Sequence, residues 1–270
     1  MKIPITLKAA TLALAGIVLG TPLSRGALVY NQGDIILAFR VANATSPSFL
    51  INLGSVTQFA NAAPGSTLSF GSISTFGQDL VDTYGASWYD LSTLSWGLFG
   101  QDENANVTLY ASRARTNLNT PATPWNALTI ANRTSTDTNV SGVTVSFANS
   151  GQTTASTNTS NAGFQSFTTT GSYYSSVTTG ATDFGSVSQW SSIEGNNASG
   201  IDSTALDLIK VGAVGAGAFP SSDLGKFTID DNGVVTFTAT IPEPSTYALL
   251  AISGLVFVVF LRRRRVSFHA

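Results

Sequence analysis

Short apolar runs, each about the length of one β-strand and bounded by Gly, Pro or Asn, recur along the middle of this sequence. Residues 34–40 (DIILAFR) and 48–53 (SFLINL) are the first two. Runs of this length between turn-forming residues favour strands over helices. A later run at 205–211 alternates apolar and polar residues, as a half-buried strand does. The sequence therefore predicts a body made mainly of β-strands.

A hairpin and two short helices are predicted between these runs. Residues 95–100 and 107–113 are β-rich and would pair as a hairpin. Residues 77–84 (GQDLVDTY) precede a glycine and predict a short helix. Residues 124–131 predict another, because the proline at their start suits the first turn of a helix.

The closing hairpin, residues 225–238, is the clearest local signal. Asn232-Gly233 separates two β-rich segments and predicts a type I′ turn. The apolar side chains expected to meet across its strands are Phe227, Ile229, Val235 and Phe237. The acidic turn sequence lacks the alternating ligand spacing of an EF-hand loop, so turn formation is preferred to calcium binding there.

The predicted fold is mainly β: an antiparallel sheet or sandwich of about seven strands with a few short helices, plus a single C-terminal transmembrane helix. An α+β arrangement is the alternative. Residues 134–182 interrupt the pattern, because Ser and Thr make up 24 of these 49 residues. Such a composition offers few large apolar groups for a core. It predicts a partly ordered surface insertion, either O-glycosylated or a polar β-rich stretch without sugar.

The N-terminus has the pattern of a secretory signal. Lys2 and Lys8 accompany an apolar run at 9–20, which is too short to span a bilayer comfortably. Small residues near position 26 favour cleavage after Gly26, with cleavage after Ala27 or an uncleaved anchor as the alternatives. We therefore expect a signal peptide at 1–26, export through the Sec translocon, and an exported domain at 27–240.

The C-terminus has the pattern of a weak membrane anchor. Residues 247–261 are almost all apolar and would form about 22 Å of helix, against about 30 Å of bilayer hydrocarbon. The cluster that follows, which the positive-inside rule keeps cytoplasmic, is Arg262, Arg263, Arg264 and Arg265. The prediction is a precursor anchored in the inner membrane by this helix.

Pro242, Glu243 and Pro244 stand directly before this helix. The proline-rich tripeptide, the apolar helix and the arginine cluster together, residues 241–265, resemble the PEP-CTERM sorting signal of Gram-negative bacteria. The resemblance implies that exosortase, an integral-membrane protease, recognises and removes the tail. It also implies an association with exopolysaccharide. More weakly, residues 28–34, 95–100 and the closing hairpin resemble an uncharacterised group of PEP-CTERM proteins from Verrucomicrobia-like bacteria.

Charge and composition exclude several functions for the body. Between Ala27 and Ile241 there are 14 acidic and 6 basic residues, a formal charge of −8, which disfavours nucleic acid as a partner. The chain has no cysteine, and its one histidine, His269, lies beyond the arginine cluster. No thiolate chemistry or imidazole catalysis is therefore available to the body. We predict no catalytic residue, no metal site and no cofactor.

The function that these features predict is a non-enzymatic protein of the cell surface or extracellular matrix, processed by exosortase and linked to exopolysaccharide or biofilm. One alternative is a secreted carbohydrate-binding or polysaccharide-active protein, because glycosidases need only two carboxylates and tryptophans stack on sugars. The acidic candidates are Asp79, Asp82, Asp90, Asp102 and Glu103, and the aromatic candidates are Trp88, Trp96, Trp125 and Trp190. Another alternative is a plain membrane-anchored periplasmic domain.

Overall fold

The computed structural model describes residues 28–42, 46–70, 75–102, 107–179, 182–185, 190, 192–215 and 217–241. The predicted signal peptide, the proline-rich tripeptide, the 247–261 helix and the arginine cluster lie outside the described residues. Within the described part of the chain, no helix is both long and apolar enough to span a bilayer.

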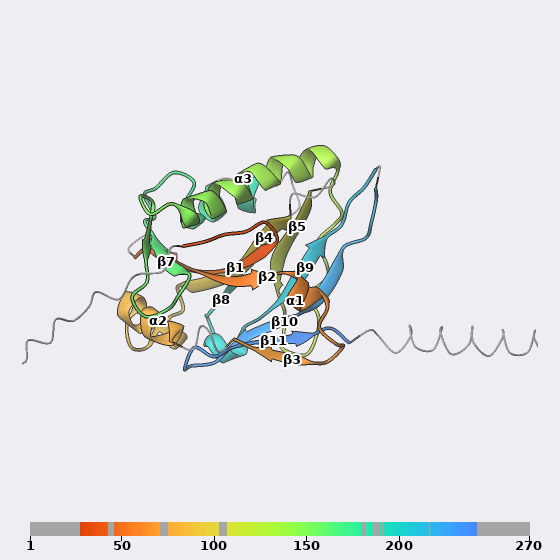
Figure 1. Cartoon of the computed structure of the whole chain (residues 1–270). Helices are drawn as coiled ribbons and strands as arrows, with labels where there is room; N and C mark the ends of the chain where they lie inside the picture. The colour runs from red at the N-terminus through yellow and green to blue at the C-terminus, as the bar shows by residue number, and fades with distance from the viewer. Residues whose placement is uncertain are drawn as a thin grey trace, which may run out of the picture.

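The described elements follow one another in a mainly β order (Figure 1). The strands are β1 (Asp34–Val41), β2 (Ser48–Ser55), β3 (Thr67–Ser69), β4 (Leu94–Asp102), β5 (Thr108–Ala114), β6 (Thr153–Ala155), β7 (Ala162–Gln165), β8 (Glu194–Asn196), β9 (Ala205–Val211), β10 (Ser222–Ile229) and β11 (Val235–Ala239). The helices are α1 (Thr57–Ala60), α2 (Phe76–Tyr84), α3 (Ile130–Ala148) and α4 (Tyr173–Thr178), with 3-10 turns η2 (Trp88–Asp90), η3 (Asp183–Gly185) and η4 (Ile201–Ser203).

The strands in the described part of the chain all belong to one antiparallel sheet of 11 strands. Its order is β3-β11-β10-β9-β5-β4-β1-β2-β7-β6, and β8 pairs with β4 beside β5. β1 lies near the centre, where Leu37 faces Ile51 of β2 on one side and Leu98 of β4 on the other. Every residue of β1 except Arg40 is buried, so the centre of the sheet is covered on both faces.

One face of the sheet curls around an aromatic core. The edge formed by β10, β11 and β3 turns beneath β1 and β2 (Figure 1). Phe39 of β1 and Phe227 of β10 therefore belong to one apolar cluster, to which α1 adds Phe59 and α2 adds Phe76. The Phe59 ring lies 5.4 Å from the Phe227 ring, centroid to centroid, in an edge-to-face arrangement that aromatic pairs prefer.

The opposite face is covered by α3, which lies across β4 and β5 (Figure 1). Thr129 begins this helix by accepting a hydrogen bond from the Asn132 backbone N–H. The helix then buries a stripe of side chains at spacings of three and four residues: Arg133, Thr136, Val140, Val143 and Phe147. Its low intrinsic propensity, expected for a run of Ser and Thr, is offset by this packing.

The structure confirms the mainly β prediction and corrects the strand count. The sheet has 11 strands rather than about seven, because β3, β6, β7 and β8 are only three or four residues long and lie outside the apolar runs. The runs at 34–40, 48–53 and 205–211 are strands, 95–100 pairs with 107–113 as a hairpin, and 77–84 is helical.

Two local predictions are wrong. No helix begins at residue 124; instead Trp125 is buried in the apolar cluster to which α3 contributes, and the helix starts at Ile130. Residues 134–182, expected to be a partly ordered surface insertion, contain most of α3 together with β6, β7 and α4. The composition of residues 134–182, averaged over the whole segment, does not reveal that the apolar residues of α3 recur at helical spacing. This spacing lets a Ser/Thr-rich segment contribute to the core.

The closing hairpin forms in the predicted register, with Phe227 opposite Phe237 and Ile229 opposite Val235. Its turn is not type I′, because that turn needs left-handed backbone at both central residues, and only Gly233 has it (φ 83°). Instead the Asp230 carboxylate accepts hydrogen bonds from the backbone N–H groups of Asn232 and Val234. A five-residue loop stabilised by an aspartate side chain thus joins the strands.

Candidate functional site

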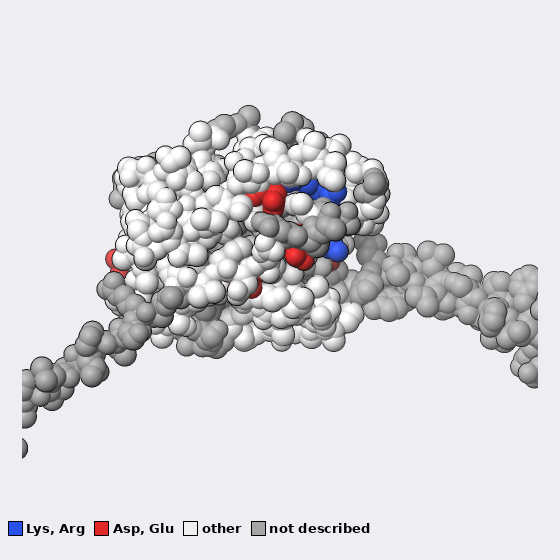
Figure 2. Space-filling view, turned by 45° about the horizontal axis from the view of Figure 1, so that its top comes forward, with Lys and Arg blue, Asp and Glu red and all other residues white. Residues whose placement is uncertain are grey.

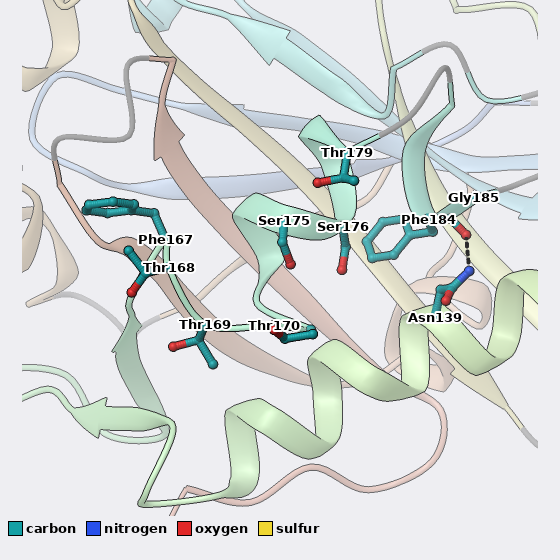
Figure 3. Close-up of a pocket in the computed structure, with 11 residues that line it drawn as sticks. Asn139, Phe167, Thr168, Thr169, Thr170, Ser175, Ser176, Thr179, Phe184 and Gly185 are labelled. Carbon is teal, nitrogen blue, oxygen red and sulfur yellow. Dashed lines mark hydrogen bonds between the residues drawn. The ribbon is translucent and has the colours of Figure 1, made fainter.

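A cavity of about 530 Å³ opens beside α4 (Figure 3). Hydroxyl groups dominate its lining, from Thr168, Thr169, Thr170, Ser175, Ser176 and Thr179. The amide of Asn139 on α3 and the ring of the partly exposed Phe167 complete the polar and apolar parts of the wall. Among its described lining residues none is charged, so this cavity can bind a neutral polar ligand through hydroxyl and amide hydrogen bonds.

The backbone on one side of this cavity is strained. Phe184 has left-handed backbone at φ 55°, which is unfavourable for a residue with a large side chain. Its ring is buried 5.1 Å from that of Phe99, and its carbonyl oxygen accepts a 2.8 Å hydrogen bond from the Asn139 side-chain amide (Figure 3). These two contacts hold η3 against β4 and α3 and so fix the cavity wall.

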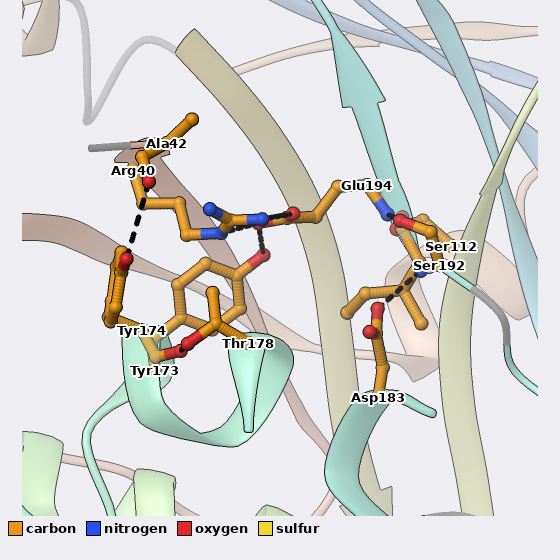
Figure 4. A network of polar contacts seen from close by, with 10 residues as sticks. Arg40, Ala42, Ser112, Tyr173, Tyr174, Thr178, Asp183, Ser192 and Glu194 are labelled. Carbon is orange, nitrogen blue, oxygen red and sulfur yellow. Dashed lines mark hydrogen bonds and ion pairs between the residues drawn. The ribbon is translucent and has the colours of Figure 1, made fainter. Parts of the chain in front are cut away.

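A second polar cluster lies on the α3 side of the sheet (Figure 4). The Arg40 guanidinium on β1 donates two hydrogen bonds to the Glu194 carboxylate on β8, one of them Nε to Oε1 at 2.8 Å. The Tyr173 hydroxyl donates to the same Oε1 at 2.8 Å, and the Tyr174 ring lies 5.5 Å from the Arg40 guanidinium carbon. The Arg40 and Glu194 side chains are only 13% and 5% exposed, so the cluster joins two strands to α4 in a largely dry environment.

A buried carboxylate, Asp183 in η3, stands behind this cluster. Its Oδ2 accepts a 2.7 Å hydrogen bond from the backbone N–H of Ile193, the residue before Glu194 (Figure 4). Burial is the main cause that raises the pKa of Asp183 to about 7. Two carboxylates with different environments are the usual signature of an acid–base pair. Here the Glu194 carboxylate already accepts hydrogen bonds from Arg40 and Tyr173. Neither acid lines either described cavity, so the cluster fits a structural role.

A third polar group lies on the other side of the molecule, where α2 approaches the loop between β6 and β7. Asp79 and Asp82 share one face of α2 and line a cavity of about 360 Å³. Asp79 Oδ1 accepts hydrogen bonds from Ser156 Oγ at 2.6 Å and from Asn158 Nδ2 at 3.0 Å. The same Asn158 Nδ2 is 3.1 Å from Asp82 Oδ2. One amide nitrogen therefore bridges two carboxylates.

The structure separates the other residues that the sequence singled out. Asp79 and Asp82 come together, whereas Asp90 lies in η2 and Asp102 ends β4; Glu103 lies outside the described residues. The four tryptophans, offered as sugar-stacking platforms, are all buried core residues: Trp88, Trp96, Trp125 and Trp190. That part of the carbohydrate-binding interpretation is wrong, because a ring with no exposed face cannot stack on a sugar.

Sequence reasoning missed the hydroxyl-lined cavity and the Arg40–Glu194 pair. The Ser/Thr enrichment of residues 134–182 is a usable signal for the cavity, although by itself it predicts a partly ordered surface insertion, with or without sugar. Nothing local in the sequence predicts that Arg40 meets Glu194, since 154 positions separate them.

Uncharged side chains dominate the face that Figure 2 brings forward, with a small group of acidic and basic residues near its centre.

The sorting residues follow the last strand closely. β11 ends at Ala239, and Ile241, the last described residue, is 64% exposed. Pro242, Glu243 and Pro244, and the four arginines at 262–265, lie outside the described residues.

Comparisons with known proteins find the PEP-CTERM protein-sorting motif at residues 240–265. No match was found for the chain among curated proteins or among solved structures. The likeness to known proteins thus covers the tail, and it does not extend to the body or to a bacterial group. The chain carries a PEP-CTERM sorting motif that marks it as an exported, surface-directed protein and a target of exosortase.

Proposed function

We propose that this chain is a non-enzymatic protein of the cell surface or extracellular matrix, whose folded body is released from its membrane-held tail by exosortase. The main support for this proposal is the position of the sorting motif directly after the folded body. The last strand ends at Ala239, and the matched motif begins at residue 240. Cleavage near Pro242 to Pro244 would therefore remove the tail without cutting any strand of the sheet.

The chemistry of the described residues favours binding or assembly over catalysis. The body has no histidine and no cysteine, so the commonest general base and the thiolate nucleophile are missing. Asp183 and Glu194, two acids that lie close together in the core, are tied to Ile193, Arg40 and Tyr173. A glycosidase needs two carboxylates that flank a substrate cleft, and this pair lines neither described cavity. Asp79 and Asp82 do line the smaller cavity, but the amide nitrogen of Asn158 bridges them.

The test is peptide mapping and intact mass of the protein purified from its own host. We expect a C-terminus between Pro242 and Ser245, with the body in the extracellular or surface fraction. The double variant Pro242→Ala/Glu243→Ala should accumulate as a membrane-bound precursor that ends at Ala270, whereas Thr246→Ala, outside the tripeptide, should be processed normally. A wild-type protein that keeps Ala270 in the membrane fraction would overturn the proposal and leave a plain anchored domain.

A second candidate, binding of a neutral polysaccharide, is favoured by the hydroxyl-lined cavity. Its uncharged described lining and its partly exposed Phe167 ring match the hydroxyl and apolar faces of a sugar. We expect exopolysaccharide from the host to retard the protein in affinity electrophoresis. Thr169→Val combined with Ser176→Ala should abolish the retardation. Thr138→Val, on an exposed part of α3, is the matched control and should leave it unchanged. Equal retardation of all variants would exclude this cavity as the binding site.

A further inference from the structure

The cavity between α2 and the β6–β7 loop contains an unusual arrangement of acidic oxygens. Asp79 and Asp82, three residues apart, project from one face of α2 towards residues 156–159. This loop supplies Ser156 and Asn158 as hydrogen-bond donors and Thr157 as part of the cavity lining. The Asp79 carboxylate is thus directed at the wall opposite its own helix.

Asp79 is incompletely satisfied in this position. The residue is only 1% exposed, and its Oδ2 is buried without a hydrogen-bond partner. Neither Asp79 nor Asp82 has an ion-pair partner among the described residues. A buried carboxylate oxygen with neither a donor nor a counter-charge is costly, and such atoms are rare in folded proteins.

The one group that stands between the two carboxylates is the Asn158 amide nitrogen, 3.0 Å from Asp79 Oδ1 and 3.1 Å from Asp82 Oδ2. A cation shared by both acids would lie beside this group, in contact with one oxygen of each carboxylate. The oxygen and nitrogen of an asparagine amide have nearly the same shape. A half-turn of the amide would replace the bridging donor by a third oxygen ligand.

We propose that a calcium ion binds between Asp79 and Asp82, with the Asn158 side-chain oxygen and cavity waters completing its shell. Oxygen ligands without histidine or cysteine select a hard cation over zinc or copper. Calcium accepts six to eight oxygens in irregular geometry, whereas magnesium needs a regular octahedron. The cavity of about 360 Å³ leaves room for the waters that two carboxylates alone cannot replace.

The small number of charged ligands sets the expected affinity. In the described parts of the chain, no three or more His, Cys, Asp or Glu side chains lie close enough together to hold one metal ion. The proposed site therefore offers two charged ligands. Calcium modules that work outside the cell bind at about 0.1 to 1 mM, and a two-carboxylate site fits this class. Binding would join α2 to the β6–β7 loop and stabilise the body by mass action. The proposal does not depend on how the tail is processed.

The test uses the full chain in mild detergent, stripped of metal with a chelator and titrated with calcium chloride in a calorimeter. We expect saturable binding of a single ion, together with a calcium-dependent rise in melting temperature. Asp82→Asn should weaken binding by at least about tenfold. Because Asp82 is exposed, this variant should fold without calcium as the wild type does.

Asp202→Asn is the matched control, since Asp202 is also an exposed aspartate and contacts a second acid, Asp231. It should bind calcium like the wild type. Asn158→Ala, which removes the third oxygen but keeps both charges, should fall between the wild type and Asp82→Asn. Absence of saturable binding up to about 10 mM calcium would overturn the proposal. Wild-type affinity in Asp82→Asn, or loss of binding in Asp202→Asn, would overturn it equally.

Discussion

Arg40 and Glu194 form a two-pronged ion pair across the strand that separates them, although 154 positions lie between them in the chain. Arg40 belongs to β1 and Glu194 to β8, and β4 runs between these strands. Gly97 is the β4 residue opposite Glu194, and its missing side chain leaves space for the pair and for the Tyr173 hydroxyl. A long-range ionic contact therefore depends on one glycine.

Removing one partner of this pair should destabilise the protein. Glu194→Gln would leave the Arg40 charge largely buried without its counter-charge, at a cost of about 3 kcal/mol in the free energy of unfolding. Urea unfolding followed by circular dichroism measures the change. The double variant Arg40→Met/Glu194→Met removes both charges and should recover most of the loss. Equal stability of Glu194→Gln and the wild type would mean that the pair is not formed in solution.

Filling the space above Gly97 with a side chain should also destabilise the protein. A Cβ added there would lie 3.0 Å from the Tyr173 hydroxyl and 3.3 Å from the Ile193 carbonyl oxygen. We expect Gly97→Val to lower the free energy of unfolding by about 2 to 3 kcal/mol through overpacking. Gly142→Ala on α3 is the control, because a Cβ there meets nothing within 4 Å. It should raise stability by about 0.5 to 1 kcal/mol, since alanine is the better helix former. A neutral Gly97→Val would contradict the close packing.

Stability should depend on pH through Asp183. Burial raises the pKa of this carboxyl from its ordinary 3.8 to about 7, so between these values the folded chain binds a proton that the unfolded chain has released. The resulting stabilisation is complete below pH 3.8 and is lost as the pH rises through 7.

The measurement compares unfolding free energies of the wild type and Asp183→Asn from pH 4 to pH 8. The free energy of unfolding of the wild type should fall relative to that of Asp183→Asn as the pH rises. The fall should reach about 1.4 kcal/mol per pH unit where the profile is steepest. Asparagine keeps an acceptor for the Ile193 N–H but does not titrate, so its profile should be flatter. Parallel profiles would rule out a raised Asp183 pKa.

The closing hairpin should depend on Asp230. Its Oδ1 lies 3.0 Å from the Asn232 backbone nitrogen and 2.7 Å from that of Val234, and both are donors. Asp230→Ala should therefore lower the free energy of unfolding by about 1 kcal/mol. Asp231→Ala, next in the chain, removes an equal charge without these bonds and should change stability less. If the two variants behave alike, the turn does not depend on the side-chain acceptor.

The sequence predicted those parts of the fold whose signals are local. β1, β2, the β4–β5 hairpin and β9 coincide with apolar runs, and the closing hairpin follows from two β-rich segments around a turn. The type of that turn could not be read from Asn232-Gly233, because the Asp230 side chain provides a competing way to reverse the chain.

The rest depends on contacts between distant segments. α3 is a run of weak helix formers stabilised by what it buries, and only the spacing of Val140, Val143 and Phe147 indicates it. Asp79 and Asp82 could be paired from their spacing on a helix, but their shared partner Asn158 is more than 70 residues away. The candidate sites were therefore visible only in part, as residue types without their partners.

The strand order has a consequence for the timing of folding. β11 lies between β10 and β3, and among the described strands β3 has no other partner. The last of the described strands to be synthesised therefore completes a sheet that began with β1. An exported chain crosses the membrane from its N-terminus, and Val235–Ala239 is therefore the last part of the sheet to emerge. The sheet can close only when translocation has reached the sorting motif itself. In the proposed membrane-held precursor, closure of the sheet and arrival of the tail at the membrane would therefore coincide, and exosortase would meet a body that has just become able to fold.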